Sequence, residues 1–203
     1  MTKKHKKNNI IKILLAIFIW SIFWFSSQAV FFINYNLPIE NIDTNTIFIY
    51  FTFWVLFIAI IGIVIWRWKV NNFSFLRIKN KKILWLYLVP ILFAVVILIN
   101  GAPVDINRYY YVFAMTTTTF LAQDMLTFGF LQTYLEKHTK PSYAAMITTL
   151  VFFIAHLTFD LSIFTLIYAS GIILFGYLRY KTKNIYLLNI IHMSFLLLPF
   201  NIL

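Results

Sequence analysis

The amino-acid sequence predicts an all-α fold, a multi-pass transmembrane helical bundle of about seven spans with its N-terminus in the cytoplasm. Hydrophobic residues make up 62% of the 203 residues and charged residues only 11%, whereas a soluble domain carries roughly 25% charge. The charged residues lie mostly between long apolar runs. Helices are expected for such runs, because every backbone polar group in lipid must find its partner within the protein.

The limits of the apolar runs place the individual spans. We expect spans at about Ile11 to Phe32, Thr46 to Trp66, Ile83 to Asn100, Tyr109 to Tyr134, Ser142 to Phe159, Leu161 to Leu178 and Ile185 to Leu203. Spans one to three fall within residues 1–108 and the other spans within residues 109–203, and together they form one integral membrane domain. The chain has no cysteine, which excludes disulfides, thiolate metal ligands and a cysteine nucleophile.

The positions of the basic residues indicate the orientation. With the N-terminus inside, the cytoplasmic segments hold all 17 Lys and Arg residues except Arg108, as the positive-inside rule requires. This pattern is typical of a multi-pass protein of a bacterial-type cell membrane. Topology and contact with anionic membrane lipid account for the formal charge of +11, and we expect no nucleic-acid partner. A cleaved signal peptide is the alternative for the first run, which is longer than a usual signal core.

Three ionisable residues fall inside predicted spans: Asp124 in span four, His156 in span five and His192 in span seven. Such residues are costly in lipid and usually functional. Their depths from the cytoplasmic side are roughly 16, 21 and 10 Å, so modest helix tilt brings them to one wet cavity. There they are candidates to polarise water or to hold a divalent metal, although the sequence requires no cofactor. The alternative is that each makes an interhelical hydrogen bond.

Short motifs surround these residues in order along the chain. They are Gln123-Asp124-Met125-Leu126-Thr127-Phe128-Gly129-Phe130-Leu131, then Phe152 to His156, then His192 with Leu196, and a small-residue helix with a basic turn, Ser170 to Thr182, precedes the last. The pattern resembles the CPBP family (CAAX proteases and bacteriocin-processing enzymes, also called Abi). The motifs of that family are Glu-Glu-x-x-x-Arg-Gly, Phe-x-x-x-His and His-x-x-x-Asn. The resemblance covers Ala122 to Leu196 and makes residues 109–203 the CPBP-like part of the domain.

The resemblance implies an intramembrane endopeptidase site with several departures. In the family, the first Glu activates water with help from the motif-two His, the motif-three His and Asn hold the oxyanion, and a metal role has also been proposed. Here the first Glu is Gln123, which marks the motif position but is not a base. The motif Arg is Phe128 and the motif Asn is Leu196. Asn189, one turn before His192, is a candidate replacement for the lost amide donor.

Two functions follow from the resemblance, and the sequence leaves enzymatic activity open between them. One is a diverged or non-catalytic relative that binds a membrane-embedded peptide, in bacteriocin immunity or regulation. The alternative is an active endopeptidase that processes a peptide or protein, with Asp124 acting through His156 and with His192 as oxyanion donor. A rhomboid-like serine protease built on Ser170 and His192 is a third hypothesis. A transporter or channel is a fourth, and no repeat or broken-helix signature favours it.

Overall fold

The computed structural model describes residues 3–35, 44–68, 71–78, 80–100, 120–158 and 163–197, and these are helical with no strand among them. The all-α prediction is therefore confirmed for this part of the chain. The helices are α1 (Lys3–Tyr35), α2 (Thr44–Arg67), α3 (Leu88–Asn100), α5 (Phe120–Asp124), α6 (Gln132–Glu136), α7 (Pro141–Leu157), α8 (Ile163–Thr182) and α9 (Tyr186–Leu197). The 3₁₀ segments η2 (Asn71–Leu76) and η3 (Lys81–Tyr87) precede α3, and the π-helix η5 (Met125–Leu131) joins α5 to α6.

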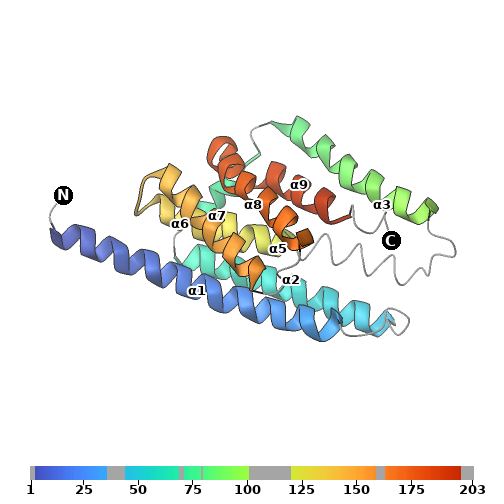
Figure 1. Cartoon of the computed structure of the whole chain (residues 1–203), viewed down its shortest axis with the longest axis horizontal. Coiled ribbons are helices and arrows are strands. Elements are labelled where there is room, and N and C mark those ends of the chain that lie inside the picture. Colours follow the sequence, from blue (N-terminus) through green and yellow to red (C-terminus); the bar gives the residue numbers. More distant parts are fainter. Residues whose placement is uncertain are drawn as a thin grey trace.

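The helices wrap around the short α5–η5–α6 rod (Figure 1). Helices α1 and α2 lie along one side of it, α7 and α8 pack on each other beside it, and α9 lies between α5 and α3. The rod corresponds to the cytoplasmic half of predicted span four, whose first residues, 109–119, lie outside the described part of the chain. The central position of the rod brings its polar residues within reach of three other parts of the sequence.

Among the described residues, one helix is long and apolar enough by itself to cross a membrane. This helix is Asn9–Ser27 within α1, so the count of about seven spans stays a prediction. Many large apolar side chains on the outer faces remain exposed, among them Phe18 at 61%, Phe48 at 69% and Ile173 at 62%. Soluble monomers rarely expose apolar surface on this scale. The pattern is typical of helices that contact lipid.

The basic segments predicted to share the cytoplasmic side lie at one end of the molecule. Partial burial of His138, in the turn after α6, lowers the pKa of its imidazole. The nearby positive charge of Lys12 on α1 lowers it further. Lys183, in the turn after α8, lies 4.0 Å from Glu136 of α6. Tyr186 donates to the carbonyl of Leu76 in η2 at 2.7 Å. This grouping is the one that the predicted orientation requires, and the orientation stays a prediction.

Aromatic side chains fill the space between α1 and the central rod. Trp20 and Trp24, four residues apart on one face of α1, are buried with ring centroids 5.4 Å apart. The indole Nε1 of Trp20 donates to Thr127 Oγ1 of η5 at 3.0 Å, and Trp24 packs edge-on against Phe152 of α7 at 5.0 Å. Each such aromatic pair contributes roughly 0.5–1.5 kcal/mol beyond area burial. These contacts fix the position of the π-helix.

The π-helix η5 is buried along its whole length. Its wide turn is visible in the hydrogen bond from the backbone N–H of Gln132 to the carbonyl of Thr127, five residues back. Gly129 lies within it at the motif glycine position. A Cβ there would come within 2.7 Å of the Phe75 ring, so only glycine allows η2 to pack this closely on η5. Single π-turns inside α-helices often mark functional sites.

Candidate functional site

Asp124 is the centre of a fully buried polar cluster. It ends α5, its exposure is 0%, and both carboxylate oxygens have partners on α9. Asn189 Nδ2 donates to Asp124 Oδ2 at 2.7 Å, and His192 Nδ1 donates to Asp124 Oδ1 at 3.0 Å. Asn189 and His192 are three residues apart, so they share one face of α9. Two of the three ionisable residues predicted to meet are therefore in direct contact.

Tyr87 extends this cluster to a third part of the chain. It is the last residue of η3, and its hydroxyl donates to Asn189 Oδ1 at 2.9 Å. The amide of Asn189 is thus used at both ends, as acceptor from Tyr87 and as donor to Asp124. Sequence analysis did not find Tyr87, because one tyrosine at the start of an apolar run is an ordinary feature of a chain that is 20% aromatic.

His156 is placed by a backbone carbonyl and by aromatic rings. Its Nδ1 donates to the carbonyl of Phe152 one turn back at 2.9 Å, and its ring lies 5.1 Å from Trp24. Phe152 contacts both imidazoles, with centroid distances of 4.5 Å to His156 and 6.2 Å to His192, edge-on in each case. The structure thus connects His156 to the Asp124–His192 pair through a phenyl ring.

The comparison with protein families bears on the four hypotheses for function. Residues 105–198 match the family described as Type II CAAX prenyl endopeptidase Rce1-like. This segment of the chain is similar to the CAAX-type (CPBP) endopeptidases. The searches of curated proteins and of solved structures found no match. The Rce1-like segment contains all three motifs, so the family resemblance is confirmed, and it favours the CAAX-type hypotheses over a rhomboid-like one.

The Rce1-like segment departs from the family at positions that the structure places inside the core. Gln123, at the position of the first Glu, is 7% exposed. Phe128, at the position of the Arg, is fully buried and packs edge-on against Phe152 at 5.4 Å and Phe175 at 6.1 Å. Phe175 lies 5.3 Å from His192. Two phenyl rings, Phe152 and Phe175, therefore lie against the His192 imidazole, and Phe128 packs against both of these rings.

The predicted metal candidates Asp124, His156 and His192 do not fit a resident metal in this arrangement. Within the described ranges, no three His, Cys, Asp or Glu side chains come together as ligands. Both Asp124 oxygens already accept from Asn189 and His192, and a catalytic zinc site generally has three protein ligands. We therefore derive no step through a metal.

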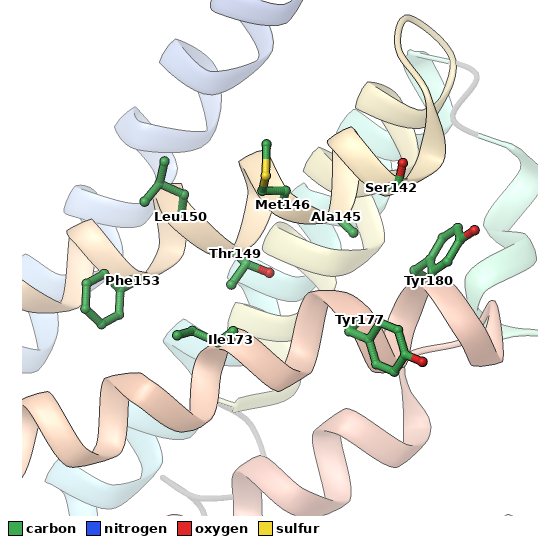
Figure 2. A pocket seen from close by; sticks show the side chains of 9 residues that line it. All are labelled: Ser142, Ala145, Met146, Thr149, Leu150, Phe153, Ile173, Tyr177 and Tyr180. Atoms are coloured by element: carbon green, nitrogen blue, oxygen red, sulfur yellow. The ribbon is translucent and has the colours of Figure 1, made fainter.

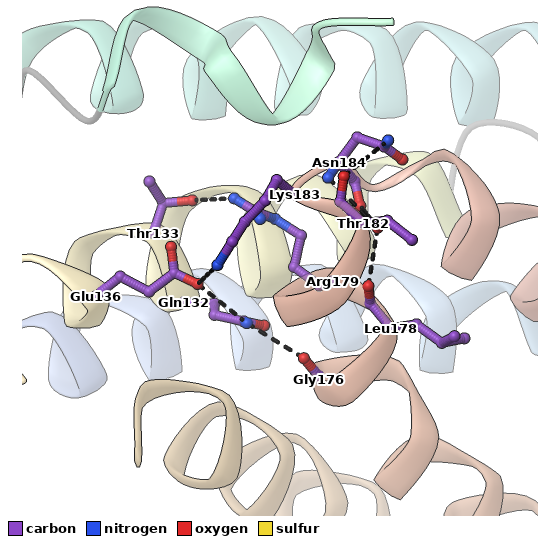
Figure 3. A network of polar contacts seen from close by, with 9 residues as sticks. All are labelled: Gln132, Thr133, Glu136, Gly176, Leu178, Arg179, Thr182, Lys183 and Asn184. Carbon is purple, nitrogen blue, oxygen red and sulfur yellow. Dashed lines mark hydrogen bonds and ion pairs between the residues drawn. The ribbon is translucent and has the colours of Figure 1, made fainter. Parts of the chain in front are cut away.

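A second polar cluster lies two to three turns away, at the basic end of the molecule (Figure 3). Arg179 of α8 is 2% exposed and donates from Nη2 to Thr133 Oγ1 at 3.0 Å. Gln132 Nε2 donates to the Gly176 carbonyl at 3.3 Å and to Glu136 Oε1 at 3.4 Å. These contacts join α6 to the small-residue helix α8. They hold α6, the C-terminal part of the rod, in position against α8.

Proposed function

We propose that this chain is a non-catalytic relative of the CAAX-type intramembrane endopeptidases that binds a membrane-embedded peptide, in a bacteriocin immunity or regulatory role. The observation that carries the proposal is the condition of the motif-one carboxylates. One of them is replaced by Gln123, and the other, Asp124, is fully buried with both oxygens bonded to α9. The site keeps both motif histidines and lacks the first Glu, the residue that activates water in the family.

The replacements have a large expected cost for catalysis. Loss of a positioned general base lowers a rate by about 10² to 10⁴. Asp124 is one methylene shorter than the Glu of the family motif, and a shift of roughly 1 Å in a reacting group costs about a hundredfold. The amide of Asn189 donates to a carboxylate, which is a different role from stabilising an oxyanion. Together these changes favour binding over cleavage.

The surroundings of His192 support the same conclusion. Hydrolysis consumes a water molecule, whereas the rings of Phe152 and Phe175 make their side of the imidazole apolar. Polar side chains in membrane bundles commonly serve as interhelical bonds, worth about 0.6 to 1.7 kcal/mol each. In this proposal the Asp124 cluster holds α9 and η3 against α5, and so preserves the shape of the surface that the peptide contacts.

The Asp124–His192 pair favours a second candidate function, an active endopeptidase. A carboxylate 3.0 Å from Nδ1 fixes the orientation and tautomer of an imidazole, as general bases require. In this candidate, water attacks the peptide carbonyl carbon and gives its proton to His192. The same proton then passes to the leaving amine as the peptide bond breaks. Gln123 takes no part as a base in either function.

The two functions are separated by measuring cleavage and binding of the same peptide. Purified protein in proteoliposomes is given a prenylated CAAX peptide and a panel of hydrophobic bacteriocin-like peptides. Binding is measured by fluorescence anisotropy, and products are measured by mass spectrometry. We expect binding without products, and we expect Asp124→Asn and His156→Ala to retain much of the binding. Products from the wild type that disappear in both variants, at equal protein level, would establish the endopeptidase instead.

Gln123→Glu is the matched gain-of-function variant. It restores the carboxylate at the family's first position and changes a side chain that is nearly isosteric. If the scaffold retains a peptide in the family's register, slow cleavage is expected to appear in this variant alone. Gln123→Met is its control, because it keeps a side chain of similar length at the same position and adds no carboxylate.

A further inference from the structure

A groove of about 520 Å³ runs between α7 and α8 on the outer surface of the molecule (Figure 2). Its floor is made of small residues, Ala145 and Thr149, which lie against Gly176 of α8. A Cβ on Gly176 would overlap Thr149 and come within 2.8 Å of the Ala145 carbonyl oxygen. The helices therefore approach closely here, as small residues allow in membranes, and longer side chains on each helix rise on both sides of the floor.

The groove changes character along its length. Leu150 and Phe153 of α7 and Ile173 of α8 line one end, and the hydroxyls of Ser142, Tyr177 and Tyr180 lie toward the other end. From Ser142 to Phe153 the groove follows α7 for roughly 16 Å. A groove that is apolar at one end and carries hydroxyl groups at the other fits an amphiphile, with one hydrocarbon chain lying along the groove.

Positive charge is concentrated at the polar end. The Lys181 ammonium lies 5.4 Å from the Tyr177 ring centroid and 5.8 Å from that of Tyr180. Lys183 lies 4.5 Å from the Tyr180 ring, and Lys140 lies 6.0 Å from Tyr143 at the start of α7. Of these three lysines, Lys183 alone is paired with an acid among the described residues, at 4.0 Å from Glu136. Lys140 and Lys181 therefore leave a net positive charge at this end.

We infer that this groove binds an anionic phospholipid of the cytoplasmic leaflet, with one acyl chain along the groove and the phosphate beside Lys140 and Lys181. The apolar end fits the chain, and the lysines fit a net negative headgroup better than a zwitterionic one. Each Lys near an anionic lipid surface strengthens binding by roughly fivefold. The inference is independent of whether the Asp124 cluster binds or cleaves a peptide, because the groove shares no side chain with that cluster.

The test uses phosphatidylglycerol with a photoreactive diazirine on one acyl chain, in proteoliposomes made otherwise of phosphatidylcholine. After irradiation, labelled peptides are identified by mass spectrometry. We expect labels on groove residues such as Met146 and Leu150. Lys140→Gln with Lys181→Gln should lower this labelling roughly 30-fold, and Lys81→Gln with Lys82→Gln, which removes the same charge from η3, should leave it unchanged. Met146→Trp, which fills the groove and keeps both lysines, should lower it as well.

Several outcomes would overturn the inference. They are equal labelling by diazirine phosphatidylcholine, equal labelling of the exposed face of α1 around Phe18, and full labelling in the double lysine variant. Competition by millimolar glycerol phosphate would indicate an anion site without an acyl chain, and competition by a hydrophobic peptide but not by unlabelled phosphatidylglycerol would indicate a peptide site. Circular dichroism and size-exclusion profiles confirm that each variant is folded, so that reduced labelling reports the groove.

Discussion

Asn189 on α9 donates a 2.7 Å hydrogen bond to Asp124, 65 residues earlier in the chain. Leu196, one turn after His192, stands where the family's third motif has its Asn. The side-chain amide of this protein, Asn189, comes one turn before His192 instead. At that position it binds the motif-one carboxylate. Asn189, which the sequence suggested as a substitute oxyanion donor, therefore forms a hydrogen bond between α9 and α5.

The Asn189–Asp124 bond is testable by a double-mutant cycle. Asn189→Leu leaves a carboxylate oxygen buried without this partner, and we expect it to lower the free energy of unfolding by about 1–3 kcal/mol. Asp124→Leu alone should cost a similar amount, and the double variant should cost less than the sum because both polar groups are gone. Unfolding in mild detergent, followed by circular dichroism, measures each value. Strictly additive effects would contradict a direct bond.

Tyr87→Phe removes one hydroxyl and keeps the ring. We expect a loss of about 1 kcal/mol, together with faster reaction of Asp124 with a hydrophobic carbodiimide, since Asn189 would hold the carboxylate less firmly. Tyr186→Phe is the matched control, because it removes a hydroxyl that bonds the Leu76 carbonyl outside the cluster. Equal carbodiimide rates in the two variants would show that Tyr87 does not support Asp124.

Gly129→Ala introduces a methyl group against the Phe75 ring, at 2.7 Å from Cε2. Overpacking of a buried site typically costs about 1–3 kcal/mol, so the midpoint of thermal unfolding should fall. Phe75→Leu combined with Gly129→Ala should recover much of that loss by making room. Gly62→Ala is the control, since nothing lies within 4 Å of a Cβ there. Gly62→Ala should be neutral or slightly stabilising, because Ala is the better helix former, and an equal loss in the two glycine variants would contradict the close packing of η2 as the cause.

Membrane orientation is accessible by labelling single cysteines, because the chain has none of its own. Cysteines placed at Asn72 and Asn184 should react with an impermeant maleimide from the cytoplasmic side, and one placed at Asn41 should react from outside. The basic segments at one end of the structure lead to the same expectation for the first two. An exterior signal at Asn72 would reverse the orientation and the depths derived from it.

Much of the site could be predicted because ionisable residues inside apolar runs are few and costly. This scarcity identified Asp124, His156 and His192, and the one-turn spacing before His192 added Asn189. It did not give the orientation of His156, which depends on packing against Trp24 from a distant helix. It also missed the Trp20–Thr127 bond, because an aromatic residue in a run rich in aromatic residues carries no distinguishing signal.

The helix pattern was predicted better than the local geometry. The runs of apolar residues correspond to the observed helices, but span four was expected as one regular helix. Its described part is α5, η5 and α6 in succession. A change from i→i+4 to i→i+5 hydrogen bonding leaves no periodic trace over seven residues that are all buried, because no polar face marks the shift.

The π-helix has a consequence for how this protein tolerates changes in chain length. A π-turn holds one residue more than an α-turn needs, and one residue of an α-helix corresponds to about 100° of rotation. Deleting one residue from Met125–Leu131 would let this stretch become ordinary α-helix and would leave Asp124 and Thr133 on nearly the same faces. A second deletion has no extra residue to remove and would turn Asp124 about 100° away from α9. The same deletion in the turn of residues 137–140 would leave both clusters aligned. The π-helix is therefore expected to tolerate the loss of one residue and not the loss of two.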